Sequence, residues 1–232
     1  MVRESGVYPS PVGFAASSSS GVTSLATLLA LADSRLPIGG HVHSGGVEEA
    51  VASGLVRDIA TVELYLRRRI ETSGLVAASL AAAVCAGELD PARAEAEADA
   101  RTPSPGARTA SRAQGRGLLR LAKQLWPQRD WSELGVRPHL STVFGAVGAA
   151  CGVTPAELAG IVVYTTLTGA ATAAQRLLAL DPAAIAACTF RLTGLCDRTA
   201  AAAVTGLAAL SDPLQDVLAQ RHLDRAIPLF AS

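Results

Sequence analysis

A signal for the start of a helix recurs along this chain and limits the folds that it can adopt. A side chain with an oxygen atom stands directly before a proline at Asp90-Pro91, Thr154-Pro155, Asp181-Pro182 and Asp212-Pro213. The oxygen can accept a hydrogen bond from a free amide of the first turn, and proline suits the first helical position because that position needs no intrahelical donor. Glu157 adds a capping box to Thr154. The signal therefore predicts a helix after each of these prolines.

The rest of the sequence is also typical of helices. No segment shows the sustained alternation of apolar and polar residues that a half-buried strand requires. Half of the residues are hydrophobic but only 4% are aromatic, and this composition favours closely packed helices over sheets. We expect helices at 24–33, 45–54, 59–86, 91–101, 106–125, 138–151, 155–180, 183–210 and 213–224, with a break or kink at Gly74 in the third.

These helices are expected to form one all-α domain, a single-domain multi-helix bundle of about nine or ten helices over residues 24–232. Helices 155–180 and 183–210 are rich in Ala and Gly on every side. We therefore expect them at the centre of the bundle, where small residues allow close approach. Residues 1–23 are rich in Ser, Gly and Pro and are expected to be a disordered extension, with neither a secretory signal nor a membrane span in the chain.

Charge and cysteine content narrow the functional classes. The formal net charge is zero, whereas a nucleic-acid-binding protein normally has an excess of basic residues. The run Arg67-Arg68-Arg69 is interpreted as a solvated face or as ion-pair partners rather than as a phosphate track. The four cysteines are scattered without a C-x-x-C motif, which fits reduced thiols in the cytoplasm. We expect neither nucleic acid nor a membrane as a partner.

The segment from residue 32 to residue 49 is the most unusual part of the chain. It contains one proline and four glycines, and glycine is costly in a helix interior, so we expect a tight bend between two helices. Ser44 is the expected N-cap of the second helix, and Glu48 and Glu49 would lie near its positive end. His41 and His43 stand in the bend, where they would face a partner.

His41 and His43 are also the candidates for a metal site. Imidazole suits nickel, zinc and copper, but two ligands make a weak site and a tight one needs three or four. The sequence has no P-loop motif, a single lysine and no G-x-S-x-G element around Ser44, so no residue is assigned a catalytic role. Two alternatives stay open: a helical metal-binding enzyme that uses His41, His43 and Glu48, and a helical regulator of transcription.

Three further polar residues each allow two interpretations. Arg112 and Arg116 lie four residues apart on one helix face. They could reach a nucleotide phosphate on a partner protein, or they could form ion pairs on the helix surface or be packed guanidinium groups. His139 stands at a helix start, and we expect a capping or a buried, hydrogen-bonded histidine there rather than a metal ligand.

The C-terminal end combines a short amphipathic helix with an apolar tail. Arg221 and Arg225 lie beside the apolar face of this helix, and Leu229 and Phe230 follow it. Such an end suits docking onto another protein, and packing on the chain itself is the alternative.

Several of these segments resemble the UreF family of urease accessory proteins. The resemblance is carried by Leu36-Pro37-Ile38-Gly39 with Ser44, Gly46 and Glu48, by Ser111–Arg116, by Pro138-His139 with Phe144-Gly145, by Ala173–Leu177, and by the tail Pro228–Ser232. Each motif is short, but together they occur in the family's order over residues 24–232. His41 stands where the family usually has Phe or Tyr, and Pro228 stands where a basic residue is usual.

The resemblance implies an all-α, homodimeric protein of the cytoplasm that is not an enzyme by itself. Members of the family act in the maturation of the nickel enzyme urease. They bridge a UreD/UreH scaffold protein and the GTPase UreG, so that nickel is inserted into apo-urease, and regulation of the GTPase has been proposed. No tightly bound cofactor is implied, because the assembled complex handles the nickel.

The resemblance also implies which residues bind partners. These are Pro37, Gly39, His41, His43, Ser44, Gly46, Glu48, Tyr164, Arg221, Arg225, Leu229 and Phe230. Tyr164 is expected in the binding cleft near the glycine-rich bend. Arg112 and Arg116 would then be the residues that face the GTPase.

Overall fold

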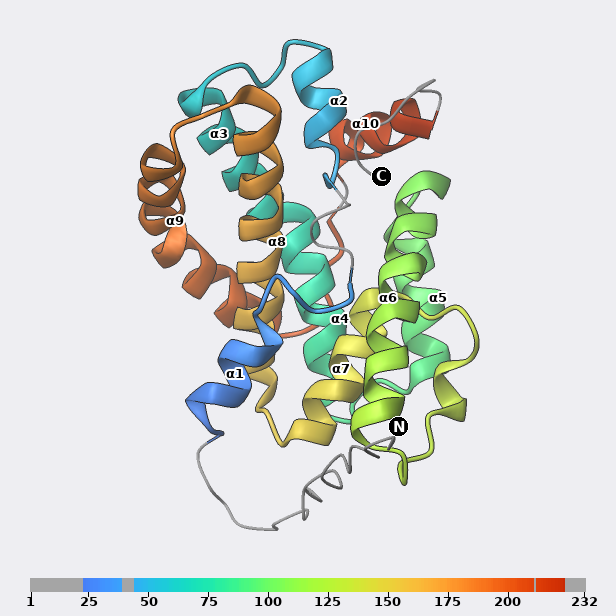
Figure 1. Cartoon of the computed structure of the whole chain (residues 1–232). Helices are drawn as coiled ribbons and strands as arrows, with labels where there is room; N and C mark the ends of the chain where they lie inside the picture. The colour runs from blue at the N-terminus through green and yellow to red at the C-terminus, as the bar shows by residue number, and fades with distance from the viewer. Residues whose placement is uncertain (1–22, 39–43, 211, 224–232) are drawn as a thin grey trace, which may run out of the picture.

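The computed structural model describes residues 23–38, 44–210 and 212–223, and the regular elements in these ranges are all helical (Figure 1). The α-helices are α1 (Leu25–Leu31), α2 (Val47–Ala52), α3 (Ile59–Arg69), α4 (Leu75–Cys85), α5 (Pro91–Ala100), α6 (Pro105–Leu125), α7 (Leu140–Cys151), α8 (Pro155–Leu178), α9 (Pro182–Ala203) and α10 (Pro213–Leu223). A π-helical turn, Ile70–Gly74, joins α3 to α4, and a short 3-10 helix spans Ser132–Leu134. The all-α prediction is confirmed.

The helix starts follow the capping chemistry expected from the sequence. The side chains of Asp90 and Asp181 accept hydrogen bonds from backbone amides of the first turns of α5 and α9. Thr154 and Glu157 form the predicted capping box at the start of α8. Ser104, followed by Pro105, caps α6 in the same way. Local side-chain hydrogen bonds therefore set where these helices begin.

One hydrophobic core joins helices from both ends of the chain. α4 contacts α5, α7, α8 and α9, and α8 contacts α2, α3, α4, α7 and α9, so α4 and α8 form the centre of the bundle. Leu66 of α3, Phe144 of α7, Leu158 and Leu167 of α8, and Leu192 of α9 are each at most 1% exposed. No helix in the described ranges has the length and apolarity that crossing a membrane would need.

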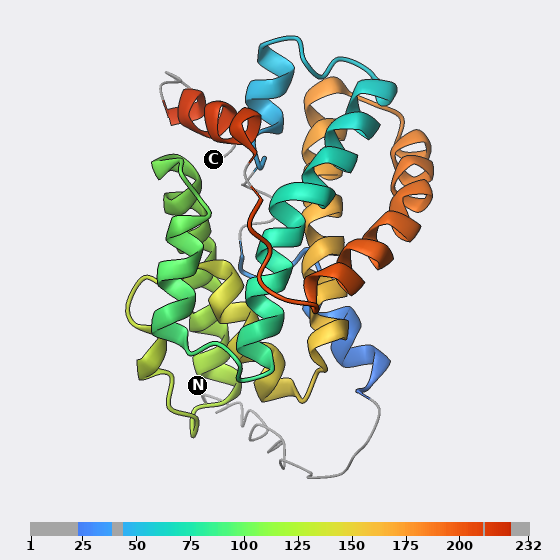
Figure 2. The same ribbon diagram turned by 180° about the vertical axis from the view of Figure 1, so that it is seen from behind.

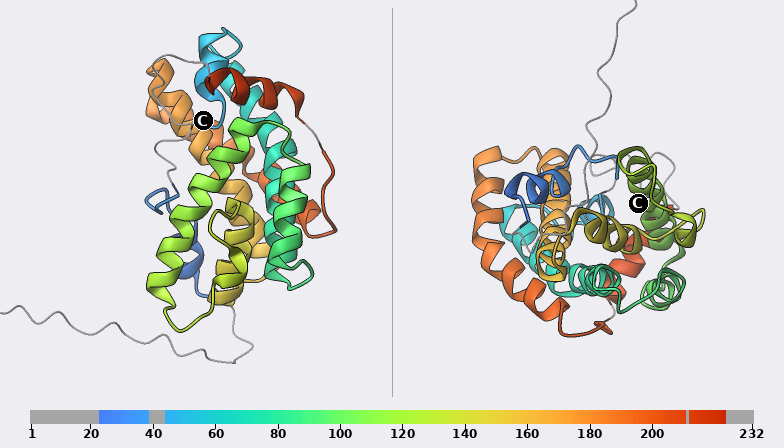
Figure 3. Two further views of the ribbon diagram at one scale, coloured as in Figure 1. Left: turned by 90° about the vertical axis from the view of Figure 1, so that its right-hand side faces the viewer. Right: turned by 90° about the horizontal axis from the view of Figure 1, so that it is seen from below.

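The expected central position is confirmed for α8 but wrong for α9. α9 lies at the outer edge of the bundle, as the view from below shows (Figure 3), and Phe190 in its middle is 78% exposed. Alanine has the highest helix propensity and does not need burial, so an Ala-rich helix is also stable at the surface. α9 ends at Ala203, earlier than predicted, and Gly206 has a φ of 152° shortly afterwards.

The predicted break in the long third helix takes the form of the π-helical turn that ends at Gly74. The view from behind shows α3, this turn and α4 as one continuous rod (Figure 2). α3 carries polar residues toward α10, whereas seven residues of α4 are buried. One rod thus connects the polar end of the molecule to its centre.

Two glycines of α6 set the distance between this helix and its neighbours. A Cβ atom on Gly117 would lie 1.8 Å from the carbonyl oxygen of Pro37, and one on Gly115 would lie 2.2 Å from that of Pro138. Only glycine allows the backbone to approach so closely. The segment before the glycine-rich bend therefore rests directly on α6.

We predict that Gly117→Ala lowers the free energy of unfolding by about 1–3 kcal/mol, because the new methyl group must displace a backbone carbonyl. Gly160→Ala on α8 is the matched control, since a Cβ atom there has no neighbour within 4 Å. This control should stabilise the protein by up to about 1 kcal/mol through helix propensity. Thermal and chemical unfolding measure the change in stability of each variant. Equal effects of the two substitutions would contradict the close contact with Pro37.

Candidate functional site

The bend between α1 and α2 is a glycine-controlled turn in its described part. Gly45 and Gly46 have φ values of 59° and 86°, which side chains rarely adopt. Gly46, and not Ser44, is the N-cap of α2. The prediction for Ser44 is therefore wrong: its backbone carbonyl accepts from the Val47 amide, and its buried hydroxyl makes no hydrogen bond within the described residues. Because Gly45 and Gly46 are left-handed, the helix begins two residues later than predicted.

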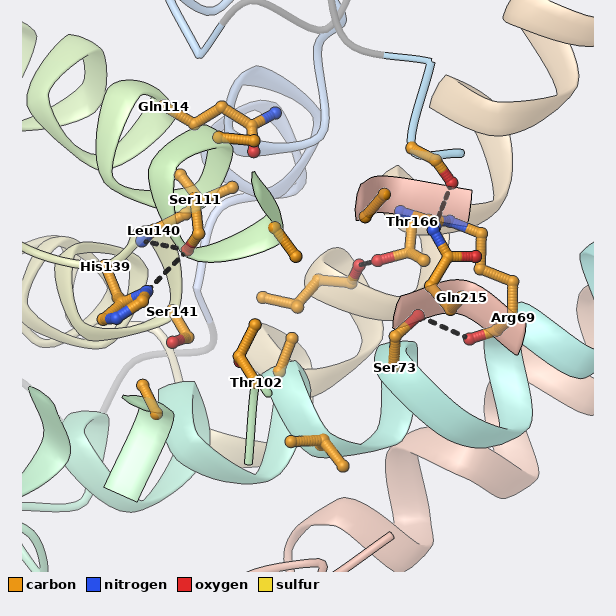
Figure 4. A pocket seen from close by; sticks show the side chains of 18 of the residues that line it. Arg69, Ser73, Thr102, Ser111, Gln114, His139, Leu140, Ser141, Thr166 and Gln215 are labelled. Carbon is orange, nitrogen blue, oxygen red and sulfur yellow. Dashed lines mark hydrogen bonds between the residues drawn. The ribbon is translucent and has the colours of Figure 1, made fainter. Parts of the chain in front are cut away.

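Three side chains converge on the carbonyl oxygen of Gly45, and Figure 4 shows two of them, Arg69 and Gln215, beside each other. The Tyr65 hydroxyl lies 2.9 Å away, Nη1 of Arg69 donates at 2.5 Å, and Nε2 of Gln215 donates at 2.6 Å. The Tyr65 hydroxyl is also 2.9 Å from Oε1 of Gln215, and burial raises its pKa, which keeps it protonated. α3 and α10 are thus joined to the turn through one atom. We call Gly45, Tyr65, Arg69 and Gln215 the carbonyl junction.

Asp212 provides a second connection between α10 and the rod. Its carboxylate accepts from Nε and Nη2 of Arg68 at 2.9 and 2.5 Å and from the Thr72 hydroxyl at 2.9 Å. It also accepts from the Gln215 amide at 3.3 Å, as a cap of α10. Burial raises the pKa of Asp212, but these hydrogen bonds outweigh burial and hold the pKa below its usual 3.8. The start of α10 is therefore held by a charged carboxylate.

The far part of α10 packs against α2 and α6. Leu218 and Ala219 are buried, and Nδ1 of His222 lies 3.7 Å from Oε2 of Glu48, with both side chains less than 5% exposed. Glu48 stands in the first turn of α2, as predicted. The C-terminal helix thus packs on the chain itself, while Val217 remains 47% exposed.

A cavity of about 280 Å³ extends from the carbonyl junction into the bundle. Figure 4 shows Arg69, Ser73 and Gln215 at one end and Ser111, His139 and Ser141 at the other. Its walls are lined by residues of α4 to α8 and α10. The bend, α3 and α10 form one end of this cavity.

The other end is a polar cluster around His139. Nδ1 of His139 lies 2.9 Å from the Ser111 hydroxyl and Nε2 lies 2.9 Å from Asp99, and the residue is 1% exposed. The prediction of a buried, hydrogen-bonded histidine is confirmed. Arg112 binds Glu95 and Asp99 at 3.0 and 2.8 Å. Burial raises the pKa of Asp99, but hydrogen bonds from His139 and Arg112 outweigh it and leave the pKa below its usual value.

The arginine run on α3 is a set of internal contacts. Arg67 lies 3.9 Å from Glu63 and Arg68 pairs with Asp212, while Arg69 belongs to the carbonyl junction. The interpretation as ion-pair partners is therefore confirmed for Arg67 and Arg68. The described residues contain no group of three or more His, Cys, Asp or Glu side chains that could hold a metal ion.

Comparison with known proteins decides the family. The sequence model of the UreF family matches residues 56–193, more than half of the chain. Proteins named "Urease accessory protein UreF" from Mycobacterium sp. (strain JLS), Mycolicibacterium vanbaalenii and Mycobacterium tuberculosis (strain ATCC 25177 / H37Ra) are 67%, 66% and 60% identical to it. In each case the match covers 91% of this chain and 100% of the relative. The chain belongs to the UreF family.

The structure brings some of the UreF-type residues together. Pro37 rests on α6, Gly46 begins α2 beside the carbonyl junction, and Glu48 faces His222. Arg221 is exposed in the last turn of α10. The other predicted partner-binding residues of the bend and tail lie outside the described residues, so their roles stay predictions: Gly39, His41, His43, Arg225, Leu229 and Phe230.

Tyr164 lies on α8 outside the cavity. It is 44% exposed on α8 and is not among the residues that line the cavity, although Val162, Thr165 and Thr166 are. Successive residues of a helix turn by about 100°, so Tyr164 points away from the cavity that its neighbours line. Its expected place in the binding cleft near the bend and its contact with a partner stay predictions.

The carbonyl junction was not predicted from the sequence. Tyr65 and Arg69 stand four residues apart and share a helix face, and this spacing was the available signal. Gln215 lies 170 residues from Gly45, and nothing in its local sequence indicates the contact. Arg112 also differs from Arg116: the first is held by two carboxylates, whereas the second is exposed.

We predict that Asp212→Asn reduces stability at neutral pH and makes the acid dependence of unfolding shallower. A carboxylate with a lowered folded pKa contributes stability above its unfolded pKa and loses it as the pH falls through the folded value. The expected loss at about pH 6 is roughly 1–3 kcal/mol, shrinking below about pH 4. Chemical unfolding between about pH 4 and pH 7 measures the difference in unfolding free energy between wild type and variant. Asp197→Asn is the control, because Asp197 is exposed. A constant difference between wild type and variant at all pH values would contradict the charged Asp212.

A second pair of variants tests the His139 cluster. Arg112→Met removes the cation that binds both Glu95 and Asp99 and should cost about 1–3 kcal/mol of unfolding free energy. Arg116→Met, one turn further along the same helix, removes an exposed cation and should change it by less than about 0.5 kcal/mol. Equal effects in urea unfolding would show that the cluster does not depend on Arg112.

Proposed function

We propose that this protein is an accessory factor of urease maturation that acts as an adaptor. It connects a UreD/UreH scaffold protein with the GTPase UreG, so that nickel, carried as cargo, reaches apo-urease. It works in the cytoplasm as a homodimer, through protein surfaces rather than a catalytic centre, and it regulates the GTPase. Membership in the UreF family and the identity of its relatives as urease accessory proteins support this proposal.

The observation that carries the adaptor role is the carbonyl junction. The bend and the C-terminal helix are the two regions expected to bind partners, and Gly45 accepts hydrogen bonds from Gln215 of α10 and from α3. A surface built from two distant segments of sequence binds a partner more tightly when the segments are already held in a fixed relation, because less conformational freedom is lost on binding. The junction provides that fixed relation before any partner arrives.

The proposal is tested by co-expression of tagged protein with the other urease operon proteins. We expect the scaffold and the GTPase to co-purify with the wild-type chain. Gly46→Ala should reduce their recovery about tenfold, because its Cβ atom would lie 2.5 Å from Nε2 of Gln215 and 2.9 Å from the Tyr65 hydroxyl.

Gly54→Ala is the matched control for this substitution. Gly54 also has a positive φ, 74°, but a Cβ atom there has no neighbour within 4 Å. It adds the same kind of backbone strain without disturbing the junction, so co-purification should persist. Equal losses in both variants would assign the effect to strain alone, and failure of the wild type to recover either partner would refute the adaptor role.

A further inference from the structure

The cavity beside the carbonyl junction is lined by two side chains of opposite charge that no ion pair neutralises. Arg69 of α3 and Asp216 of α10 both line it. Arg69 donates from Nη1 to the Gly45 carbonyl, which is a dipole and carries no full charge. Within the part of the chain that the structure describes, neither Arg69 nor Asp216 forms an ion pair. The cavity therefore contains one unpaired cation and one unpaired anion.

Asp216 has no cation to stabilise its charged form. Its Oδ1 accepts from the Ser104 amide at 3.2 Å. Burial raises the pKa of Asp216 above its usual 3.8, and the negative charge of Asp212 adds to this rise, although the hydrogen bond from Ser104 opposes it. A raised pKa means that the carboxylate is poorly stabilised in its surroundings. A cationic group inside the cavity would stabilise it.

The other charged side chains that line this cavity already have partners. Asp212 pairs with Arg68 at 2.5 Å, and Arg101 pairs with Glu97. Both ring nitrogens of His139, at the far end, are hydrogen-bonded. In the described lining, the charges that remain for a ligand are thus one guanidinium and one carboxylate.

Arg69 and Asp216 approach the cavity from α3 and α10, which form one end of it. Gln215 precedes Asp216 on α10 and donates to the same Gly45 carbonyl as Arg69. No ion pair joins Arg69 to Asp216, so their charged atoms lie more than 4.0 Å apart. A small molecule that carries both charges can therefore lie between them.

The rest of the cavity suits a small ligand with an apolar part. Its volume of about 280 Å³ is just below the range of roughly 300–1,000 Å³ that is typical for drug-sized ligands. Val76, Leu80 and Phe144 line it and are each at most 8% exposed. Leu210 also lines it and is 45% exposed, so the cavity reaches the surface and a ligand can enter.

We propose that this cavity binds a small zwitterionic amino acid with an apolar side chain. The carboxylate of the ligand lies against Arg69, its ammonium group lies against Asp216, and its side chain packs on the apolar wall. Guanidinium–carboxylate and ammonium–carboxylate contacts are charge-assisted hydrogen bonds. A ligand with a single charge would leave the other protein charge unpaired, which is unfavourable away from bulk water. This inference goes beyond the proposed adaptor role and does not rest on it.

The test measures the binding of three probes to the full chain at neutral pH by isothermal titration calorimetry. L-valine carries both charges, whereas isovalerate carries only the carboxylate and isobutylamine carries only the ammonium group on the same apolar part. We expect valine to bind at least about tenfold more tightly than either analogue, because each analogue lacks one charge-assisted hydrogen bond. Similar affinities for all three probes would overturn the zwitterion site. No binding of valine up to about 10 mM would also overturn it.

A pair of variants tests the role of Asp216. Asp216→Asn keeps an acceptor oxygen for the Ser104 amide but removes the charge. It should weaken valine binding about tenfold and leave isovalerate binding unchanged or stronger, because a carboxylate no longer repels this anion. Asp197→Asn is the control: Asp197 is exposed on α9 and does not line the cavity, so this variant should bind valine like the wild type.

Unchanged valine affinity in Asp216→Asn would overturn the proposed site. An equal loss in Asp197→Asn would also overturn it, because the loss would then not depend on the cavity. Circular dichroism shows whether both variants are folded. The comparison of the three probes on the wild type decides the proposal even where Asp216→Asn does not fold.

Discussion

The arrangement of the polar end of this molecule depends on one backbone oxygen. The Gly45 carbonyl accepts from side chains of α3 and α10, and this is feasible because two successive left-handed glycines turn the carbonyl toward them. α10 contacts α2 and α6 through a limited set of residues, so hydrogen bonds at its start have a large share in fixing its direction. Buried hydrogen bonds that converge on one acceptor specify a geometry more strictly than apolar contact does, which is what a surface built from distant segments requires.

Local signals in the sequence predicted the helices well, and long-range contacts were not predictable from it. Asp90, Thr154 and Asp181 act within three residues of their own position, so their role can be read from neighbours in the chain. The position of α9 at the surface could not be predicted in this way, since alanine suits both a buried and an exposed helix. Ser44 illustrates the same limit: it is a good N-cap residue, but the φ values of Gly45 and Gly46 moved the helix start by two residues.

The candidate site was predicted in part. The glycine-rich bend and the C-terminal helix were both identified from sequence, and the structure places Gly45 and Gln215 in contact. Tyr65, Arg69 and Gln215 were missed because a tyrosine, an arginine and a glutamine have no distinctive pattern until a partner atom is known. Arg112 and Arg116 look equivalent in sequence, yet the slow rotation of a four-residue repeat around α6 turns the first toward two carboxylates of α5 and the second toward solvent.

The π-helical turn Ile70–Gly74 has a consequence for how this fold tolerates change. A π-helical turn accommodates one residue more than the α-helical path needs, and each residue corresponds to about 100° of rotation. The turn therefore takes up an extra residue while keeping the phase between the polar side of α3 and the apolar side of α4. Deletion of a single residue here should convert the turn into regular α-helix and leave the two halves near their present phase, so that Arg68 and Arg69 still face α10 while Leu80 still faces its core neighbours. Deletion of a residue within α4 would instead rotate the part that follows it by about 100°. Chain length is therefore less constrained at this turn than within α3 or α4.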